Sequence, residues 1–219
     1  MSASVPHEVA GAVVPARRPV VAWRRAATDG LLASIWLLFA IANFKEWLAG
    51  NPAGAGTMAA ELMIVVAFVA RRKPWVTSRA PLAFVATGIG SFGALALRPA
   101  YAPLFDLGPL YLGLQLAGAL CAVVSLVYLG RSFGLVAANR GVRTEGPYRL
   151  MRHPLYASYF LAYAAYTFEN PSVQNALVLL VVLSFQIVRI RTEEALLSDD
   201  AVYLRYCKRV RYRLIPRVW

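Results

Sequence analysis

The chain has 219 residues, of which 59% are apolar and only 16% are charged, and its mean hydropathy is +0.54. This balance excludes an ordinary soluble domain and indicates an all-α, polytopic integral membrane protein. The net charge of +12 does not indicate a nucleic-acid partner, because the arginines cluster between apolar runs, as in loops that face anionic lipid.

The chain opens with residues 1–26, which we expect to be a flexible, basic cytoplasmic arm rather than a cleaved signal peptide, because prolines interrupt it and no small-residue cleavage site follows. Apolar runs then predict helices over residues 29–49, 57–71, 80–98 and 109–130, and a second pair follows at 155–168 and 172–190. A spanning helix needs about 20 apolar residues, so the second run is short unless its flanks contribute. The final pair is expected to form a tilted or partly inserted hairpin, which gives five to six membrane helices.

Charge predicts the topology of these helices. If all six runs cross with both termini in the cytoplasm, every basic residue except Lys45 and Arg98 falls on the cytoplasmic side. That bias follows the positive-inside rule. It also places the loop 131–153 and the tail 189–219 on one face of the membrane. We therefore expect an integral membrane protein, in the cytoplasmic membrane if the source is bacterial, with both termini inside.

The stretch "RHPLY" holds the only histidine outside the N-terminal arm. Proline disfavours a helical conformation at His153, while Pro154 suits the first turn of a helix. His153 is therefore expected at a helix boundary, with Tyr148 and Tyr156 near it. An interfacial belt of aromatic and arginine side chains explains Arg149 and Arg152 equally well, but it does not explain a histidine fixed at a helix start.

Two further clusters follow on the C-terminal side. In "VRIRTEEALL", Arg189 and Glu193 are four residues apart on one helical face, which is consistent with a simple salt bridge or with carboxylates that bind a cationic ligand. The tail "YLRYCKRVRYRLIPRVW" alternates tyrosine and arginine, and this pattern fits a lipid anchor and a lid over a site about equally. Glu61, alone in the second run, is more simply interpreted as an interfacial or paired carboxylate than as a functional one.

Taken together and in order, "LGRSFG", "GVRTEGPYRLMRHPLY", an apolar hairpin, "RTEEALL", "YLRY" and "RLIP" resemble the C-terminal half of the isoprenylcysteine carboxyl methyltransferase family, which also includes membrane phospholipid and thiol methyltransferases. The resemblance covers about residues 129–217. It implies an integral membrane enzyme that transfers a methyl group from S-adenosylmethionine without a soluble Rossmann domain. The expected domain plan is an arm at 1–26, membrane helices at 27–130, and a cofactor-binding and catalytic region at 131–219 within the same domain.

The resemblance also implies which residues form the site. The cofactor pocket falls on the loop before the RHP motif, the motif itself and the acidic pair; these residues are Arg140, Gly141, Val142, Arg143, Tyr148, His153, Pro154, Leu155, Tyr156, Glu193 and Glu194. Glu193 or Glu194 would face the methionine ammonium, and this choice stays open. Arg189 would meet the polar end of the substrate, and Arg189 and Glu193 are the expected catalytic residues.

This chain departs from the family pattern in two places. Ser158 stands where the family often has glycine, which makes the helix contact there tighter. The spacing from the acidic pair to the tail tyrosines is two residues shorter than expected. Of the contacts that the resemblance implies, those through Tyr203 and Tyr206 are therefore transferred from the family least directly.

Several alternatives remain at this point. An NADPH-dependent sterol-reductase-like enzyme shares an RHPxY-type motif, and a non-catalytic membrane protein or small transporter could keep the same fold. Among methyl acceptors, Arg189 favours a lipophilic carboxylate over a phospholipid amine or a small thiol.

The expected partners are a lipophilic or lipid substrate and membrane lipids, with no nucleic acid. Two distant cysteines and two distant histidines predict neither a disulfide framework nor a metal site, and the oligomeric state is open.

Overall fold

The computed structural model describes residues 22–100 and 105–219, and within them the fold is all-helical apart from one two-residue ladder. The α-helices are α1 (Ala22–Leu48), α2 (Pro52–Ala70), α3 (Pro81–Phe92), α4 (Gly108–Leu129), α5 (Pro154–Glu169), α6 (Val173–Leu197) and α7 (Ala201–Arg209). Short 3₁₀ helices are η1 (Gly93–Ala96), η2 (Gly130–Ser132) and η3 (Gly146–Arg149), and the strands are β1 (Val76–Thr77) and β2 (Ala138–Asn139). The expected arm lies outside the described residues as far as residue 21.

The helices overlap the predicted apolar runs but differ from them at their ends. α1 begins at Ala22, so residues 22–26 of the expected arm are helical, and α3 ends at Phe92 rather than at residue 98.

Two further differences at the helix ends are informative. α2 begins at Pro52, five residues before the apolar run, because Asn51 caps it by accepting a hydrogen bond from the Ala53 amide at 3.1 Å and proline suits the first turn. α6 continues past its apolar part to Leu197. The acidic pair therefore lies inside a continuous helix rather than after it.

Within the described residues, four helical segments are long and apolar enough to cross a membrane, namely Ala26–Leu48, Pro52–Ala70, Gly108–Ser132 and Val173–Leu197. The apolar segment Pro81–Ala96 is shorter. α5 has 16 residues, so it rises only about 24 Å at 1.5 Å per residue, against a hydrocarbon core of about 30 Å. The chain is thus an integral membrane protein with four candidate spans and two shorter helices beside them.

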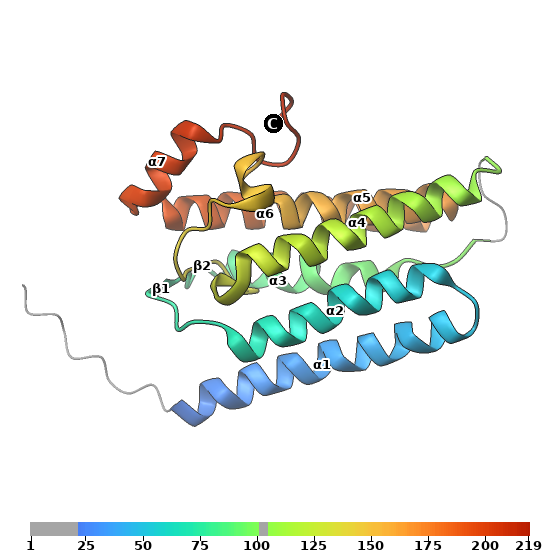
Figure 1. Cartoon of the computed structure of the whole chain (residues 1–219), viewed down its shortest axis with the longest axis horizontal. Coiled ribbons are helices and arrows are strands. Elements are labelled where there is room, and N and C mark those ends of the chain that lie inside the picture. Colours follow the sequence, from blue (N-terminus) through green and yellow to red (C-terminus); the bar gives the residue numbers. More distant parts are fainter. Residues whose placement is uncertain (1–21, 101–104) are drawn as a thin grey trace, which may run out of the picture.

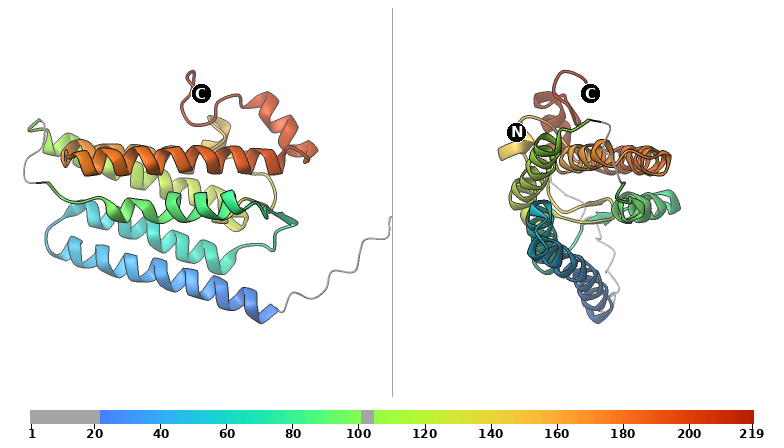
Figure 2. Two further views of the ribbon diagram at one scale, coloured as in Figure 1. Left: turned by 180° about the vertical axis from the view of Figure 1, so that it is seen from behind. Right: turned by 90° about the vertical axis from the view of Figure 1, so that its right-hand side faces the viewer.

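Helices α1 to α6 lie roughly side by side, and consecutive helices run in opposite directions (Figure 1). α2 packs between α1 and α4, α4 packs on α5, and α6 packs mainly on α3. Although α5 and α6 are consecutive, they make few contacts with each other along their length. The end-on view in Figure 2 shows α3 and α6 set apart from the row formed by α1, α2 and α4. The expected C-terminal hairpin exists, but its two helices diverge.

The contact of α4 with α5 depends on a glycine that lies on α4 rather than at the family position on α5. A Cβ on Gly118 would lie 3.0 Å from both the Ser158 carbonyl oxygen and the Ala162 Cβ. Ser158 itself is buried, and its hydroxyl donates back to the Leu155 carbonyl at 2.7 Å. The serine is therefore accommodated because the small residue stands on the opposing helix.

The loops at one end of the bundle, which we call the polar end, are joined by backbone hydrogen bonds. β1 and β2 pair antiparallel, with Val76 opposite Asn139 and Thr77 opposite Ala138. The Trp75 amide donates to the Asn139 carbonyl at 2.8 Å, and the Ser78 amide donates to the Ala137 carbonyl at 2.9 Å. The loop between α2 and α3 thus fixes the loop that follows α4.

Candidate active site

A cavity of about 680 Å³ occupies the space that the diverging helices leave. Its walls come from α1, α2, α4 and α5 on one side and from α3 and α6 on the other, and it reaches the loop that contains β2. At the polar end its lining includes Arg140, Tyr148, Arg152, His153, Leu155, Tyr156, Arg189 and Glu193. Loop residues of the polar end and residues of the membrane-spanning helices therefore share one space.

Arg189 is buried in the wall of this cavity, with 8% of its surface exposed. Its Nη1 donates to the Gln186 side-chain oxygen at 3.0 Å, its Nη2 donates to the Leu135 carbonyl at 3.1 Å, and the guanidinium carbon lies 5.1 Å from the centre of the Tyr156 ring. Its Nε makes no hydrogen bond to any described residue. A guanidinium held in this way has a donor left for an anionic ligand.

Gly90 on α3 makes room for this arginine. A Cβ at that position would lie 2.9 Å from the Arg189 Cδ and 3.3 Å from the Gln186 side-chain oxygen. The Gln186 amide also donates to the Gly90 carbonyl at 2.8 Å. The position of the guanidinium therefore depends on α3 as well as on α6.

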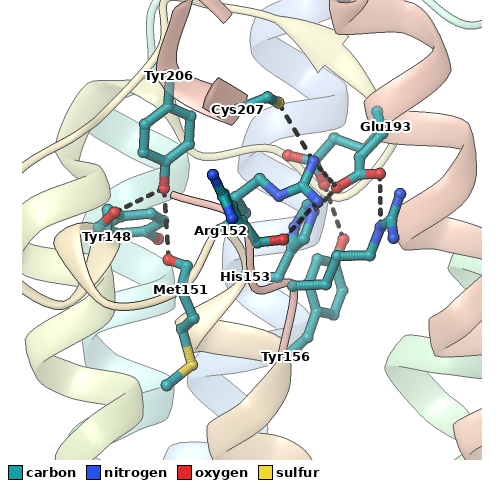
Figure 3. A network of polar contacts seen from close by, with 11 residues as sticks. Tyr148, Met151, Arg152, His153, Tyr156, Glu193, Tyr206 and Cys207 are labelled. Atoms are coloured by element: carbon teal, nitrogen blue, oxygen red, sulfur yellow. Dashed lines mark hydrogen bonds and ion pairs between the residues drawn. The ribbon is translucent and has the colours of Figure 1, made fainter. Parts of the chain in front are cut away.

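Glu193 lies one helical turn beyond Arg189 and also lines the cavity. Its carboxylate accepts a hydrogen bond from the Tyr156 hydroxyl at 3.1 Å (Figure 3). Within the described residues it belongs to none of the ion pairs, so the salt bridge with Arg189 that the sequence spacing permits does not form. A carboxylate with this single neutral partner suits a cationic ligand.

Glu194 faces a different set of partners and does not line the cavity. One carboxylate oxygen lies 2.9 Å from the Arg152 Nη1 and 3.2 Å from the His153 Nε2, and the other accepts a hydrogen bond from the Arg213 Nε at 2.8 Å. These charge-assisted contacts join α6, the turn before α5 and the C-terminal segment. We call this arrangement the Glu194 cluster. Of the two carboxylates, Glu193 faces the cavity and Glu194 organises the surrounding chain.

The RHP turn is further fixed through its backbone. The Arg152 amide donates to the Tyr212 carbonyl and the His153 amide donates to the Arg213 carbonyl, both at 2.9 Å. α5 begins at Pro154, and the His153 side chain does not cap it. The His153 imidazole, only 5% exposed, lies between the Glu194 cluster and the cavity. The predicted helix boundary is therefore correct, and the "RLIP" segment of the tail contacts it directly.

The tail tyrosines pack under η3 and contact the same turn from the other side. Tyr203 and Tyr206 form a buried cluster with Tyr148 and Val210. The Tyr206 hydroxyl donates to the Tyr148 carbonyl at 2.7 Å, as Figure 3 shows. Burial raises the pKa of Tyr206 above its usual range, and burial together with the nearby Glu193 carboxylate raises the pKa of Tyr148. Both phenols are therefore neutral hydrogen-bond donors near pH 7.

The loop 138–143 is fixed to α7 by a capping residue. Asp200 accepts a hydrogen bond from the Val202 amide at 2.8 Å at the start of α7 and another from the Asn139 side chain at 2.9 Å, which lowers the pKa of Asp200. Arg140 is buried against Gly134, where a Cβ would lie 2.1 Å from the Arg140 Nη1. A glycine at position 134 is thus required for the arginine to lie over the loop.

The structure brings only some of the expected site residues into contact with the cavity. Arg140, Tyr148, His153, Leu155, Tyr156, Arg189 and Glu193 line it, whereas Gly141, Val142, Arg143, Pro154 and Glu194 lie behind these residues. Gly141 has φ of +100°, which favours glycine and turns the loop there. Arg143 donates from its Nε to the Ser132 hydroxyl at 3.1 Å.

Other lining residues come from outside the motifs used for the sequence interpretation. They include Leu135 in the loop after α4, Tyr159 and Tyr163 on α5, Asn43 on α1 and Glu61 on α2. The tyrosines have a detectable signal, because positions 156, 159, 163 and 166 recur with helical spacing. Glu61 stands out as a lone carboxylate in an apolar run, but the sequence favours its interpretation as interfacial or paired. Asn43 has no such signal, since a single polar residue in an apolar run does not reveal what it faces.

Comparison with known families gives one result. Residues 107–200 match the family model described as phospholipid methyltransferase. The match runs from the start of α4 through the acidic pair, so it contains every cavity-lining residue named above for the polar end. No curated protein matches the chain.

The Glu194 cluster gives a stability prediction. Replacing Glu194 with Gln removes the negative charge that faces Arg152, His153 and Arg213, and we expect the unfolding free energy to fall by about 1–3 kcal/mol. The C-terminal segment should also exchange its amide hydrogens faster. Chemical unfolding and hydrogen exchange in detergent measure these effects. Glu193→Gln is the matched control for stability, and equal destabilisation by both changes would contradict the assigned role of Glu194.

Proposed function

Since residues 107–200 of the chain belong to the phospholipid methyltransferase family of membrane methyltransferases, we propose that the cavity is where a methyl group passes from S-adenosylmethionine to a lipophilic acceptor that bears an anionic group. The acceptor that the site favours is a carboxylate, which becomes a methyl ester. One observation carries this proposal. Arg189 and Glu193, one helical turn apart on α6, present a guanidinium and a carboxylate to the same cavity without pairing with each other.

The residues at the polar end fit S-adenosylmethionine by charge. This cofactor carries an ammonium, a carboxylate and a sulfonium, and it supplies an electrophilic methyl group. Glu193, which has one neutral hydrogen-bond partner, suits the ammonium. Two arginines that also line the polar end of the cavity, Arg140 and Arg152, suit the carboxylate. The site thus offers both signs of charge that the cofactor needs.

Methyl transfer from a sulfonium needs alignment and exclusion of water more than it needs acid catalysis. The balance is simple, because a carboxylate oxygen forms the new bond to the methyl carbon, the sulfur–carbon bond breaks, and no proton is released. The buried Arg189 holds the acceptor through its remaining donor. Tyr156 fixes the side chains of both Glu193 and Arg189, since its hydroxyl contacts Glu193 and its ring lies against the Arg189 guanidinium.

A second acceptor class has its own support. The matched family is described by phospholipid methylation, and a phospholipid carries a phosphate that Arg189 can bind in place of a carboxylate. In that case the reacting atom is an amine nitrogen, which loses a proton on methylation. The family match does not support the reductase alternative, because that alternative requires a different reaction class.

The orientation that the charge bias predicts belongs to the same proposal. The polar end carries η2, η3, β1, β2 and α7, and we place it in the cytoplasm, where the cofactor is available. In a cysteine-free background, Arg209→Cys should react with a membrane-impermeant maleimide only after permeabilisation, whereas Asp106→Cys should react in intact cells. The reverse labelling pattern would contradict this orientation.

Binding of the cofactor tests the role of Glu193. Glu193→Gln removes the charge that faces the cofactor ammonium, and we expect the Kd of S-adenosylmethionine to rise about tenfold or more, as for loss of a charge-assisted hydrogen bond. Titration calorimetry on the purified chain in detergent measures the change. Asp199→Asn, an exposed acid beyond the end of the same helix, is the control. Unchanged affinity in Glu193→Gln would refute this role.

The reaction itself is tested by methyl labelling of membranes that contain the chain. The labelled product should be lipid-soluble, and mild alkali should release its label as methanol if the product is a methyl ester, whereas an N-methyl group is retained. Arg189→Gln should lower kcat/KM for the acceptor by about a hundredfold, as expected for loss of a buried, charge-assisted contact.

The matched control for this change is Arg191→Gln, which removes an exposed arginine from the same helix. We expect it to retain activity, and the Kd of S-adenosylmethionine should stay unchanged in Arg189→Gln. A label that is stable to alkali would show that the acceptor group is an amine rather than a carboxylate. Absence of label with every class of lipid extract would contradict methyl transfer altogether.

A further inference from the structure

The cavity extends away from the polar end into the membrane-spanning part of the bundle, and there it meets a carboxylate that the proposed reaction does not use. Glu61, in the middle of α2, lines the cavity and is 8% exposed. Its two oxygens accept hydrogen bonds from the Asn43 side-chain amide on α1, at 3.2 and 3.1 Å. Among the described residues, it belongs to no ion pair.

Aromatic side chains surround this carboxylate within the cavity. Tyr156, Tyr159, Tyr163 and Tyr166 recur every three to four residues along α5, and all four line the cavity. Tyr159 and Tyr163 stack with ring centres 6.1 Å apart. Trp36 and Phe39 of α1 line the cavity as well. Aromatic faces next to a carboxylate are the surroundings in which proteins bind alkylammonium groups.

The charge of the cavity changes along its length. Arg189 stands at the polar end and Glu61 in the membrane-spanning part, and both line the cavity. The membrane-spanning part of the cavity therefore has a carboxyl group in its wall, which a hydrocarbon chain alone would not match.

A plain acyl or isoprenyl chain would give the Glu61 carboxyl no polar partner beyond Asn43, and a polar group buried among hydrocarbon without further partners is costly. We propose that the Glu61 part of the cavity is a second binding site, which takes an alkylammonium group of the acceptor. The acceptor is then an amphiphile with its methyl-accepting group at Arg189 and a separate cationic group at Glu61. This proposal rests on the proposed function, because it assigns a second group of the same acceptor. Binding of an alkylammonium group at Glu61 can nevertheless be measured without methyl transfer.

Binding of two matched probes tests the proposal. Octylamine, protonated near pH 7, and neutral octanol have the same chain, and each is titrated into the purified full chain in detergent micelles. Octylamine should bind about tenfold or more tightly than octanol, as expected for a charge-assisted hydrogen bond in a dry site. Glu61→Gln should lower the octylamine affinity to that of octanol and leave octanol unaffected.

Asp106→Asn is the matched control, because it removes an exposed acid outside the cavity and should leave both affinities unchanged. If Glu61→Gln does not fold, Glu61→Asp keeps the charge but shortens its reach, and the octylamine preference should shrink. Equal binding of octylamine and octanol, or an octylamine preference that survives in Glu61→Gln, overturns the proposal. S-adenosylmethionine is titrated into the same samples, so failure of the cofactor site and failure of the Glu61 site give separate results.

Discussion

The arrangement of the polar end depends on the contacts of one carboxylate, Glu194, with Arg152, His153 and Arg213. α5 and α6 contact each other little, so ordinary side-chain packing does not fix the start of α5 relative to the end of α6. Charge-assisted hydrogen bonds do so instead, and they also hold the C-terminal segment against the RHP turn. The two helices can therefore diverge and leave a cavity between them without loss of order at its mouth.

The same arrangement separates the roles of two adjacent acids. Successive residues of a helix point about 100° apart, so Glu193 and Glu194 face different neighbours. Glu194 is neutralised by its partners, while Glu193 keeps a single hydrogen bond from Tyr156 and remains open to the cavity. Arg189, one turn earlier, is held by Gln186 and the Leu135 carbonyl rather than by Glu193. Two residues with structural contacts, Gln186 and Glu194, and two that line the cavity, Arg189 and Glu193, thus lie within nine residues of one helix.

Much of this could be predicted from the sequence, because its signals are strong where a regular pattern repeats. Hydropathy and proline placement predicted the helices and the boundary at Pro154, and the order of motifs placed the site between the loop after α4 and the acidic pair. The choice between Glu193 and Glu194 could not be made, since it depends on where the C-terminal segment returns to place Arg213. The extent of the cavity was equally hidden, because it results from α6 packing on α3 rather than on α5.

The row of tyrosines on α5 has a consequence for how proteins of this type are recognised from sequence. With 16 residues, α5 is too short to count among the candidate spans, and four phenols on one face lower its hydropathy, so it does not stand with the short apolar segment Pro81–Ala96 either. If membrane crossings are counted with Pro81–Ala96 included and α5 omitted, the total is five. An odd number of crossings assigns the two chain ends to opposite sides of the membrane. In the fold, the start of α1 and the helix α7 lie at the same end (Figure 1). A helix that lines the cavity can thus escape detection, in part because of the residues that line it.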